Sequence, residues 1–231
     1  MTTLSRNARV AGLLYILASV IGIVRLLYIP KVLFVHGNPA ATAGNIAAHE
    51  MFFRLGIVCY LFSSVLFIFV TLALYRLFEG VDKRLATLMV ILGSLMPVPI
   101  FFVNSVTDAA AVLFVRGDTF LSVFDKPQRD AFVMLFLNLH HQLDLANAIF
   151  WGLWLLPLGL LIYRSRFLPR FLGPWLMLEC FAWLAFSVTG FLYPGQEATV
   201  FNYSQPLMFA ELVTMFWLAI MGAKQPRVAS T

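Results

Sequence analysis

Six apolar stretches, each long enough to cross a bilayer as a helix, occupy most of the 231 residues. A helix rises about 1.5 Å per residue, so about 20 mostly apolar residues cross a hydrocarbon core of roughly 30 Å. Inside lipid, only helices and closed barrels satisfy their own backbone hydrogen bonds. The sequence therefore predicts an all-α polytopic membrane protein, a bundle of six transmembrane helices forming one membrane domain over residues 1–231. The predicted spans are about residues 10–29, 52–75, 85–106, 144–163, 172–193 and 206–222.

The composition agrees with a chain surrounded by lipid, because 61% of its residues are hydrophobic and only 12% are charged. The net charge of +5 does not indicate nucleic-acid binding, since Lys and Arg are spread in small groups between the apolar stretches. Cys59 and Cys180 lie inside apolar stretches and form neither a disulfide framework nor a Cys-x-x-Cys pair. The lipid bilayer is the predicted partner, nucleic acid is not, and the sequence identifies no cofactor and no oligomeric state.

Basic residues outside the spans predict the orientation of the chain. Arg6 and Arg9 precede the first apolar stretch without a convincing small-x-small cleavage site, so we expect an uncleaved span rather than a signal peptide. The positive-inside rule puts both termini in the cytoplasm, because their side of the membrane carries ten Lys and Arg and the other side five. The ten are Arg6, Arg9, Arg76, Lys83, Arg84, Arg164, Arg166, Arg170, Lys224 and Arg227; the five are Lys31, Arg54, Arg116, Lys126 and Arg129.

Two segments outside the predicted spans favour helix. Asn38 followed by Pro39 is a typical helix start, so we expect a short helix over residues 40–50 at the outer surface. Asp125 begins a second helix that runs into the fourth span without a breaker. Over residues 128–163 that helix would be about 54 Å long, so its first turns either project outward or fold down as an interfacial lid.

The most unusual stretch is residues 138–147, where six of ten residues are polar at the outer end of the fourth span. At about 100° per residue, His140, Asp144 and Asn147 share one helix face, and the other polar residues spread over the opposite side. A helix that is polar on both sides cannot face lipid. It must be wet, or it must contact helices that supply hydrogen-bond partners.

Depth along the spans predicts which polar residues can meet. Counting about 1.5 Å per residue from the inner basic flank of each span, Asp144 and Asn104 both lie about 30 Å out, and His140 and Asp108 about 36 Å. Charges in hydrocarbon cost several kcal/mol unless paired or hydrated, so the matching heights predict a polar pocket. The candidate pocket residues are Arg25, Glu50, Arg54, Asn104, Asp108, Asn138, His140, Asp144 and Glu211.

Simpler roles compete with a pocket. Asp108, His141 and Arg54 could lie in the headgroup zone, where polar groups cost little. Arg25 and Glu211 are flanked on both sides by apolar residues, and they could form a salt bridge that only holds the first and sixth helices together. In either case the polar residues would serve folding rather than binding.

A metal site is the sharpest chemical hypothesis. His140 and Asp144 are four residues apart and project from one helix face as ligands do, and His49, Glu50 or Glu211 could complete a set of nitrogen and oxygen donors. The complete His-Glu-x-x-His motif of zinc proteases is absent, as are the Gly-x-Ser-x-Gly and P-loop motifs. A metal-assisted intramembrane hydrolase is therefore one alternative function.

A transporter is a second alternative. Pro97 and Pro99 in the third span and Pro157 in the fourth would break helix backbone near the middle of the membrane, as many transporters require. Against this, the six spans show no clear internal repeat.

Short sequence segments also carry a resemblance to a known family. They are Ala-Gly-Leu-Leu-Tyr at 11–15, Phe-Arg-Leu-Gly-Ile at 53–57, Phe-Leu-Asn-Leu-His at 136–140, the Arg-Ser-x-x-Leu-Pro-x-x-Leu-Gly loop at 164–173, and Glu-Leu at 211–212. In this order they resemble a bacterial family of six-span membrane proteins known only as a domain of unknown function. The resemblance implies a bacterial inner (plasma) membrane location and six helices, and it supplies no activity. Its motif positions match Arg54, Asn138, His140 and Glu211, whereas residues 141–144 depart from the more apolar sequence usual there.

The leading functional hypothesis is that the chain binds a small polar molecule or lipid headgroup in an outward-facing pocket bounded by spans one, two, three, four and six. Arg25 and Arg54 would contact an anion, and His140, Asp144 and Glu211 would form hydrogen bonds or handle protons. A purely structural role is the remaining alternative, and it predicts that the polar groups pair with one another and leave no cavity.

Overall fold

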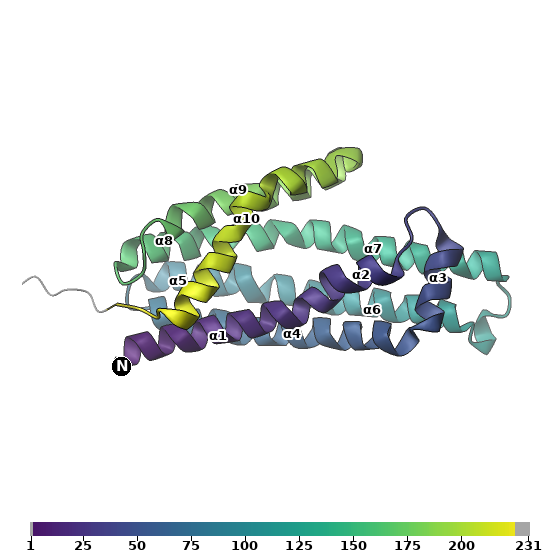
Figure 1. The fold of residues 1–231 in the computed structure, drawn as a ribbon, viewed down its shortest axis with the longest axis horizontal. Helices are drawn as coiled ribbons and strands as arrows, with labels where there is room; N and C mark the ends of the chain where they lie inside the picture. Colours follow the sequence, from purple (N-terminus) through teal and green to yellow (C-terminus); the bar gives the residue numbers. More distant parts are fainter. Residues whose placement is uncertain (1, 225–231) are drawn as a thin grey trace, which may run out of the picture. The chain divides into compact units, whose positions relative to one another are not determined.

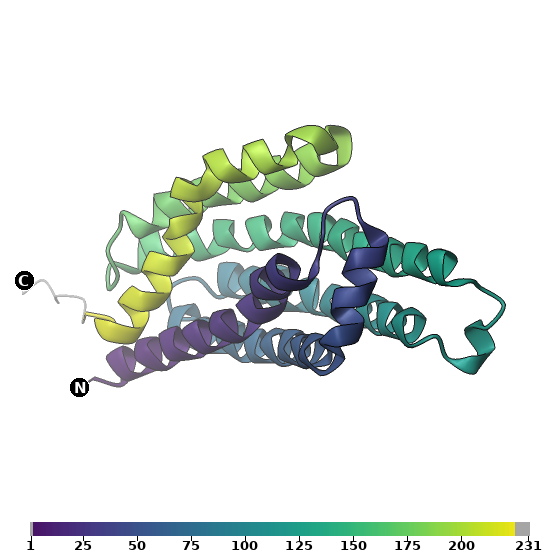
Figure 2. The same ribbon diagram turned by 45° about the vertical axis from the view of Figure 1, so that its right-hand side comes forward.

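The structure is a computed structural model that describes residues 2–224. These residues form helices and turns without a β-strand, which confirms the predicted all-α class. Figures 1 and 2 show the ribbon from two directions. In chain order the elements are α1 (Thr3–Ile23), the π-helical turn η1 (Val24–Tyr28), α2 (Ile29–Leu33), α3 (Pro39–Ala48), α4 (Glu50–Phe78), α5 (Lys83–Val90), the π-helical turn η2 (Ile91–Leu95), α6 (Pro97–Arg116), the 3-10 turn η3 (Thr119–Leu121), α7 (Lys126–Leu153), α8 (Leu155–Ser165), α9 (Leu172–Leu192), the 3-10 turn η4 (Pro194–Gln196) and α10 (Glu197–Ile220).

Among the described residues, five helical segments are long and apolar enough to cross a bilayer, which supports the predicted polytopic membrane protein. The predicted sixth span corresponds to α10, a helix of 24 residues. It is not one of the five, because the polar run Asn202–Gln205 lies in its first half. The sixth span therefore stays a prediction. The five segments are Thr3–Leu33, Glu50–Phe78, Lys83–Arg116, Lys126–Ser165 and Leu172–Leu192.

Side-chain caps begin the two helices that were predicted outside the spans. Asn38 Oδ1 accepts a hydrogen bond from the Ala41 N–H at 3.0 Å and starts α3. Asp125 and Gln128 exchange bonds at the start of α7, each side chain accepting from the other's backbone N–H, at 2.8 and 2.9 Å. Both predicted helices are confirmed. Because α7 runs unbroken to Leu153, its first turns extend the helix and do not fold back as a lid.

Prolines interrupt three of the long helical segments. Pro30 and Pro97 have no N–H to donate, so the carbonyl four residues earlier loses its partner. Just before each of them the backbone widens into a π-helical turn, η1 or η2, whose last bond spans five residues instead of four. Pro157 acts similarly at Trp154, where α7 ends and α8 begins. The predicted breaks near Pro97 and Pro157 are present, and the one before Pro30 was not predicted.

The helices form two compact units, each with its own apolar core. Unit 1 comprises the described parts of residues 1–18, 65–98 and 145–231. Unit 2 comprises residues 19–64 and 99–144. The fully buried side chains of the unit 1 core include Leu74, Phe78, Met89, Leu155, Leu158 and Leu161, and those of unit 2 include Ile29, Leu33, Ile46 and Phe53.

In unit 1, glycines allow α8 and α9 to pack at backbone contact. A Cβ atom on Gly159 would lie 2.6 Å from the Gly173 carbonyl oxygen, and the reverse distance is also 2.6 Å. Farther along α9, a Cβ on Gly152 of α7 would lie 2.8 Å from the Cys180 carbonyl oxygen. These contacts leave no room for a larger residue. Within unit 1, α9 then turns through η4 into α10, and the two helices lie side by side in both views (Figures 1 and 2).

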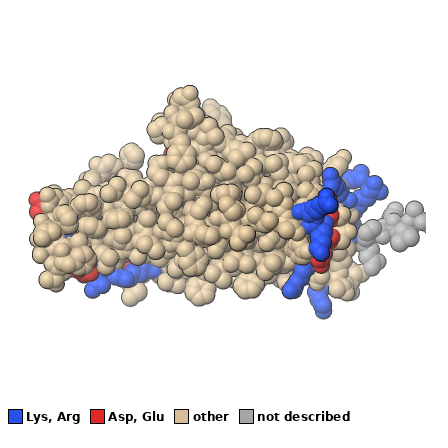
Figure 3. Space-filling model, turned by 180° about the vertical axis from the view of Figure 1, so that it is seen from behind, with Lys and Arg blue, Asp and Glu red and all other residues tan. Residues whose placement is uncertain are grey.

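The first and last described residues and a group of basic residues lie at one end of unit 1. The Lys224 N–H donates to the Phe167 carbonyl oxygen at 3.0 Å, and the Arg164 guanidinium pairs with Asp82 at 2.8 Å. The N-terminus lies at this same end (Figure 1), and Figure 3 shows Lys and Arg side chains gathered there. Arg227, which the topology prediction also counts, lies outside the described residues.

Candidate functional site: a buried polar cluster in unit 2

An arginine and an aspartate form a closed ion pair inside unit 2. Arg25 Nε lies 2.6 Å from Asp108 Oδ2, and Arg25 Nη2 lies 2.6 Å from Asp108 Oδ1. Arg25 is 2% exposed and Asp108 is fully buried. This two-pronged geometry is the strongest form of such a pair, because the planar guanidinium matches both carboxylate oxygens.

The local backbone and two aromatic rings hold Arg25 in place. The residue belongs to the π-helical turn η1, so its side chain leaves the helix at an angle that a regular α-helix would not give it. Its guanidinium carbon lies 5.7 Å from the ring centres of both Phe34 and Phe53, within reach of a cation–π attraction. Arg25 is thus packed on the sides that it does not use for Asp108.

His140, on α7, connects this pair to a second carboxylate. Its Nδ1 atom lies 3.1 Å from Asp108 Oδ1, and its Nε2 atom lies 3.3 Å from Asp144 Oδ2. Nδ1 is also 3.3 Å from the Asn104 carbonyl oxygen. The imidazole, only 3% exposed, therefore stands between two carboxylates, one on α6 and one on its own helix.

Neutral side chains complete the cluster around Asp144. Its Oδ1 atom accepts hydrogen bonds from the Tyr60 hydroxyl at 2.8 Å and from the Asn104 amide at 2.7 Å. The Tyr60 ring packs 5.4 Å from the His140 ring and 4.8 Å from the Phe101 ring, measured between centres. We call Arg25, Tyr60, Asn104, Asp108, His140 and Asp144 the polar cluster.

The charges of the polar cluster balance when His140 carries a proton. Arg25 and a protonated His140 then offset Asp108 and Asp144, whereas a neutral imidazole leaves one net negative charge. Because the His140 imidazole can gain or lose a proton, the net charge of the polar cluster can change, and its neutral form can accept a hydrogen bond from a ligand.

Hydrogen-bonding capacity remains in the polar cluster. Among the described residues, none donates to Asn104 Oδ1, although this atom is buried, whereas the buried His140 Nε2 has Asp144 Oδ2 at 3.3 Å. Buried polar atoms usually have a partner, so each such atom needs an explanation. Asp144 adjoins both residues and is the most exposed of the acidic and basic members, with 14% of its side chain open.

The structure brings five of the predicted pocket residues together and leaves four elsewhere. Arg25, Asn104, Asp108, His140 and Asp144 are in the polar cluster, and the Asn104–Asp144 and Asp108–His140 contacts agree with the predicted match in depth. The four others lie apart from these contacts: Glu50 and Arg54 pair with each other at 2.7 Å on the partly exposed side of α4, Asn138 is exposed, and Glu211 belongs to unit 1.

Tyr60 is the member that sequence reasoning missed. It is a lone tyrosine in the apolar run of the second span, where such a ring is usually explained by packing or by the membrane interface. A weak signal was available, because counting about 1.5 Å per residue from Arg76 puts Tyr60 about 24 Å out, within reach of Asn104.

The predicted metal site lacks a complete donor set in the part of the chain that the structure describes. Within residues 2–224, no group of three or more His, Cys, Asp or Glu side chains is arranged to hold a metal ion. His140 and Asp144 do lie 3.3 Å apart, but His49, a proposed further ligand, points Nδ1 at the Asn45 carbonyl oxygen of its own helix turn.

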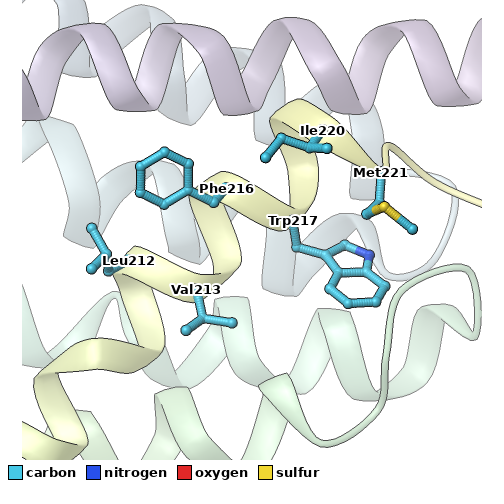
Figure 4. Close-up of a pocket in the computed structure, with 6 residues that line it drawn as sticks. All are labelled: Leu212, Val213, Phe216, Trp217, Ile220 and Met221. Atoms are coloured by element: carbon cyan, nitrogen blue, oxygen red, sulfur yellow. The ribbon is translucent and has the colours of Figure 1, made fainter.

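An apolar cavity, in contrast to the polar cluster, lies beside α10 in unit 1. Its volume is about 350 Å³, and its lining is apolar. The lining residues, Leu212, Val213, Phe216, Trp217, Ile220 and Met221, follow one another on a single helix (Figure 4). Such a lining suits a hydrocarbon chain, so the cavity offers nothing to a polar ligand.

Comparison with known proteins identifies the family. The family model described as a domain of unknown function, DUF4386, matches residues 10–222. The chain belongs to the DUF4386 family. An uncharacterised protein of Archaeoglobus fulgidus is 30% identical to this DUF4386 chain over 83 residues, which is 36% of the chain. The match spans about half, 48%, of that relative. No solved structure matches the chain. The predicted resemblance to a domain of unknown function is confirmed, and it assigns no activity.

Proposed function

We propose that this DUF4386 protein is a six-span protein of a bacterial inner membrane, with both termini in the cytoplasm, and that its polar cluster binds a small polar molecule or a lipid headgroup. The observation that carries the binding proposal is the buried acceptor Asn104 Oδ1, which has no partner among the described residues and lies inside helices long and apolar enough to cross a membrane. Intramembrane ionisable residues are expensive to maintain and commonly mark functional sites.

The layout of unit 1 supports the topology. Its N-terminus and residue 224 lie at one end, together with a group of Lys and Arg side chains (Figures 1 and 3). The 24 residues of α10 would be about 36 Å long, enough to cross the hydrocarbon core as the sixth span. An even number of spans returns the chain to the side on which it started.

Labelling of single cysteines tests this topology. In a Cys59→Ala/Cys180→Ala background, Glu79→Cys should react with a membrane-impermeant maleimide only after bacterial cells are opened, because the loop after α4 would be cytoplasmic. Thr119→Cys, in the loop after α6, should react in intact cells. The reverse pattern would overturn the orientation, and reaction of both positions in intact cells would overturn the span count.

The available atoms indicate the chemistry of the ligand. Arg25 uses Nε and Nη2 on Asp108, so an incoming anion would have to compete with a buried carboxylate. By contrast, Asn104 Oδ1 is a free acceptor, and the Asp144 carboxyl group next to it also accepts hydrogen bonds. The ligand is therefore a hydrogen-bond donor, carrying hydroxyl or ammonium N–H groups, rather than the anion expected from the sequence.

A structural role is the competing explanation, because most members of the polar cluster already pair with one another. Such networks are weak grounds for a stabilising role, since well-packed apolar residues of similar volume often give equal or greater stability. The two explanations differ in one measurable respect: only a binding site makes the stability of the protein depend on a headgroup that carries donors.

Lipid-dependent unfolding separates the two explanations. The full chain is reconstituted in nanodiscs of phosphatidylcholine alone, or with phosphatidylethanolamine or phosphatidylglycerol added, and its Tm is measured. Phosphatidylcholine has no headgroup donor, whereas the other two carry N–H or O–H groups. Binding predicts a higher Tm in one or both donor lipids, and native mass spectrometry should find that lipid retained on the protein. Soluble ethanolamine and glycerol, added to the phosphatidylcholine discs, test for a free small molecule.

Variants make the result specific to the polar cluster. Asn104→Leu keeps the branched shape of the side chain but removes the free acceptor, together with the amide that donates to Asp144, and should abolish the lipid-dependent difference in Tm. Asn138→Leu is the matched control on the exposed face of α7 and should keep it. Equal Tm values for the unsubstituted protein under every condition would favour the structural role, and an unchanged lipid response in folded Asn104→Leu would move binding elsewhere.

A further inference from the structure

Two glutamates meet in unit 1. Glu179 lies on α9 and Glu211 on α10. Glu179 Oε2 accepts a hydrogen bond from the backbone N–H of Glu211 at 3.0 Å. The Tyr15 hydroxyl, on α1, donates to Glu211 Oε1. Glu179 is 1% exposed, so its carboxyl group has been taken out of solvent.

Neither glutamate has a basic partner among the described residues. No Lys, Arg or His side chain of residues 2–224 forms an ion pair with Glu179 or Glu211, and the groups that donate to them, the Tyr15 hydroxyl, the Glu211 amide N–H and the Trp183 indole, are all neutral. Glu179 Oε1 is buried, and within the same range it accepts no hydrogen bond of full geometry. The polar cluster shows how such a carboxylate is normally compensated, because Asp108 there has Arg25.

An unpartnered hydroxyl group lies on the same face of α10 as Glu211. Thr214 is 1% exposed and follows Glu211 by three residues. Its Oγ1 atom has no partner in the described part of the chain. Oxygen atoms of this kind are the neutral ligands with which proteins surround small hard cations.

Position along the helices places the pair deep in the membrane. Glu179 lies about 14 Å from Arg170 and Glu211 about 20 Å from Lys224, each measured from the basic end of its helix at about 1.5 Å per residue. In a hydrocarbon core of roughly 30 Å these depths are close to the middle. A bare carboxylate there costs several kcal/mol, and two adjacent ones cost more because they repel each other.

We propose that Glu179 and Glu211 form an intramembrane binding site for small monopositive cations, either protons or alkali-metal ions. The cation supplies a positive charge, because no basic side chain among the described residues pairs with either glutamate. A divalent metal site is disfavoured, because no group of three or more His, Cys, Asp or Glu within residues 2–224 is placed to hold one. Tyr15 and Thr214 would contribute hydroxyl oxygens to an alkali ion, or hydrogen bonds to a protonated carboxyl group.

Carbodiimide labelling tests the proposal on the full chain in detergent micelles. Dicyclohexylcarbodiimide is apolar and adds to a carboxyl group only in its protonated form, leaving a stable acylurea that peptide mass spectrometry locates. At about pH 6, labelling at Glu179 or Glu211 is expected to exceed that at exposed Glu79 by at least tenfold. Labelling should fall as the pH rises. Glu179→Gln and Glu211→Gln should each lose the label at the substituted position, whereas Glu79→Gln should leave both sites reactive.

Competition by salts distinguishes the two kinds of cation. Sodium or potassium chloride is compared with choline chloride at equal ionic strength and pH. Protection by sodium or potassium, with none by choline, identifies an alkali ion as the occupant. Labelling that no salt reduces identifies protons. Either result supports a site for monopositive cations.

A second measurement covers the case in which the reagent cannot reach the site. Infrared difference spectra between about pH 6 and pH 9 should contain the carbonyl band of a protonated carboxyl group that is missing from folded Glu179→Gln/Glu211→Gln. Equilibrium binding of radioactive sodium at about pH 9 is measured beside it. The proposal is overturned if the infrared difference is unchanged by the double substitution and the protein binds neither sodium nor potassium.

Discussion

The two units of this protein treat buried acids in opposite ways. In unit 2, Asp108 has a guanidinium held by two bonds of 2.6 Å, and an imidazole reaches both Asp108 and Asp144. In unit 1, Glu179 and Glu211 receive hydrogen bonds from neutral donors only, among the residues described. In unit 2 the cost of a buried carboxylate is met by basic side chains of the chain itself, whereas in unit 1 the proposed site leaves that role to a mobile cation. Removing an acid or a base should therefore have opposite consequences in the two units.

Substitution of Arg25 should have the largest effect on stability. Arg25→Met leaves Asp108 buried without its cation, and such a change typically costs about 3–5 kcal/mol. Denaturant titration in mixed micelles, followed by circular dichroism, would measure the loss. The double variant Arg25→Met/Asp108→Leu should recover much of it, because no charge then remains unpaired. If the double variant were as unstable as Arg25→Met, the ion pair would not explain the loss.

Substitution of Tyr60 should have an intermediate effect. Tyr60→Phe removes one of the two bonds to Asp144 Oδ1 while the ring contacts with His140 and Phe101 remain. Loss of a hydrogen bond to a charged group typically costs about 1.5–3 kcal/mol. The same titration measures it, and Phe101→Leu serves as a packing control that keeps the hydroxyl. Equal stability of Tyr60→Phe and the unsubstituted protein would show that Asn104 alone suffices.

Neutralising Glu179 should cost little or should stabilise the protein. Glu179→Gln keeps an oxygen that can accept from the Glu211 N–H, and it removes a charge with no basic partner in the described chain. We expect a change within about 1 kcal/mol of zero near neutral pH, because a hydrogen bond is retained and no cation is left unpaired. In the same assay, Asp108→Asn should be clearly destabilising, because it leaves Arg25 unpaired. Equal losses for the two variants would erase the contrast between the units.

The smallest effect is expected on α4. Arg54 pairs with Glu50 four residues earlier, and both side chains are at least a third open, at 41% and 33%. Exposed pairs of this spacing contribute about 0.3–0.5 kcal/mol. Arg54→Met should therefore shift the unfolding midpoint slightly, and high salt should remove the shift. A loss as large as that of Arg25→Met would mean that Arg54 contacts a buried acid when the protein is in lipid.

The sequence predicted the depth of each polar side chain along its helix better than it predicted which helices are adjacent. The rise per residue fixes how far a side chain lies along its helix, so the predicted match in depth between Asn104 and Asp144 agrees with the hydrogen bond between them. It does not fix which helices are adjacent or how each is rotated about its axis. Glu211 was therefore grouped with the outer cluster although its contacts are Tyr15 and Glu179.

The ion-pair partner of Arg25 was not predicted for a related reason. The sequence suggested a salt bridge between Arg25 and Glu211, whereas Arg25, in the π-helical turn η1, pairs with Asp108. Glu50 and Arg54, by contrast, form a contact that their spacing in the sequence explains. Their spacing of four residues allowed a local pair within one helix, and that pair formed in preference to contacts with the polar cluster.

The π-helical turn also makes the chain sensitive to length. A π-turn accommodates one residue more than the α-helical turn it replaces, so deleting one residue from Val24–Tyr28 would restore a regular helix without shortening it by a full turn. The residues on either side of the turn would keep their faces, because the π-turn absorbs the extra residue locally, whereas residues inside the turn, Arg25 among them, would be reoriented. A shift of one residue, rather than any change of chemistry, would be enough to turn the guanidinium of Arg25 away from its acid.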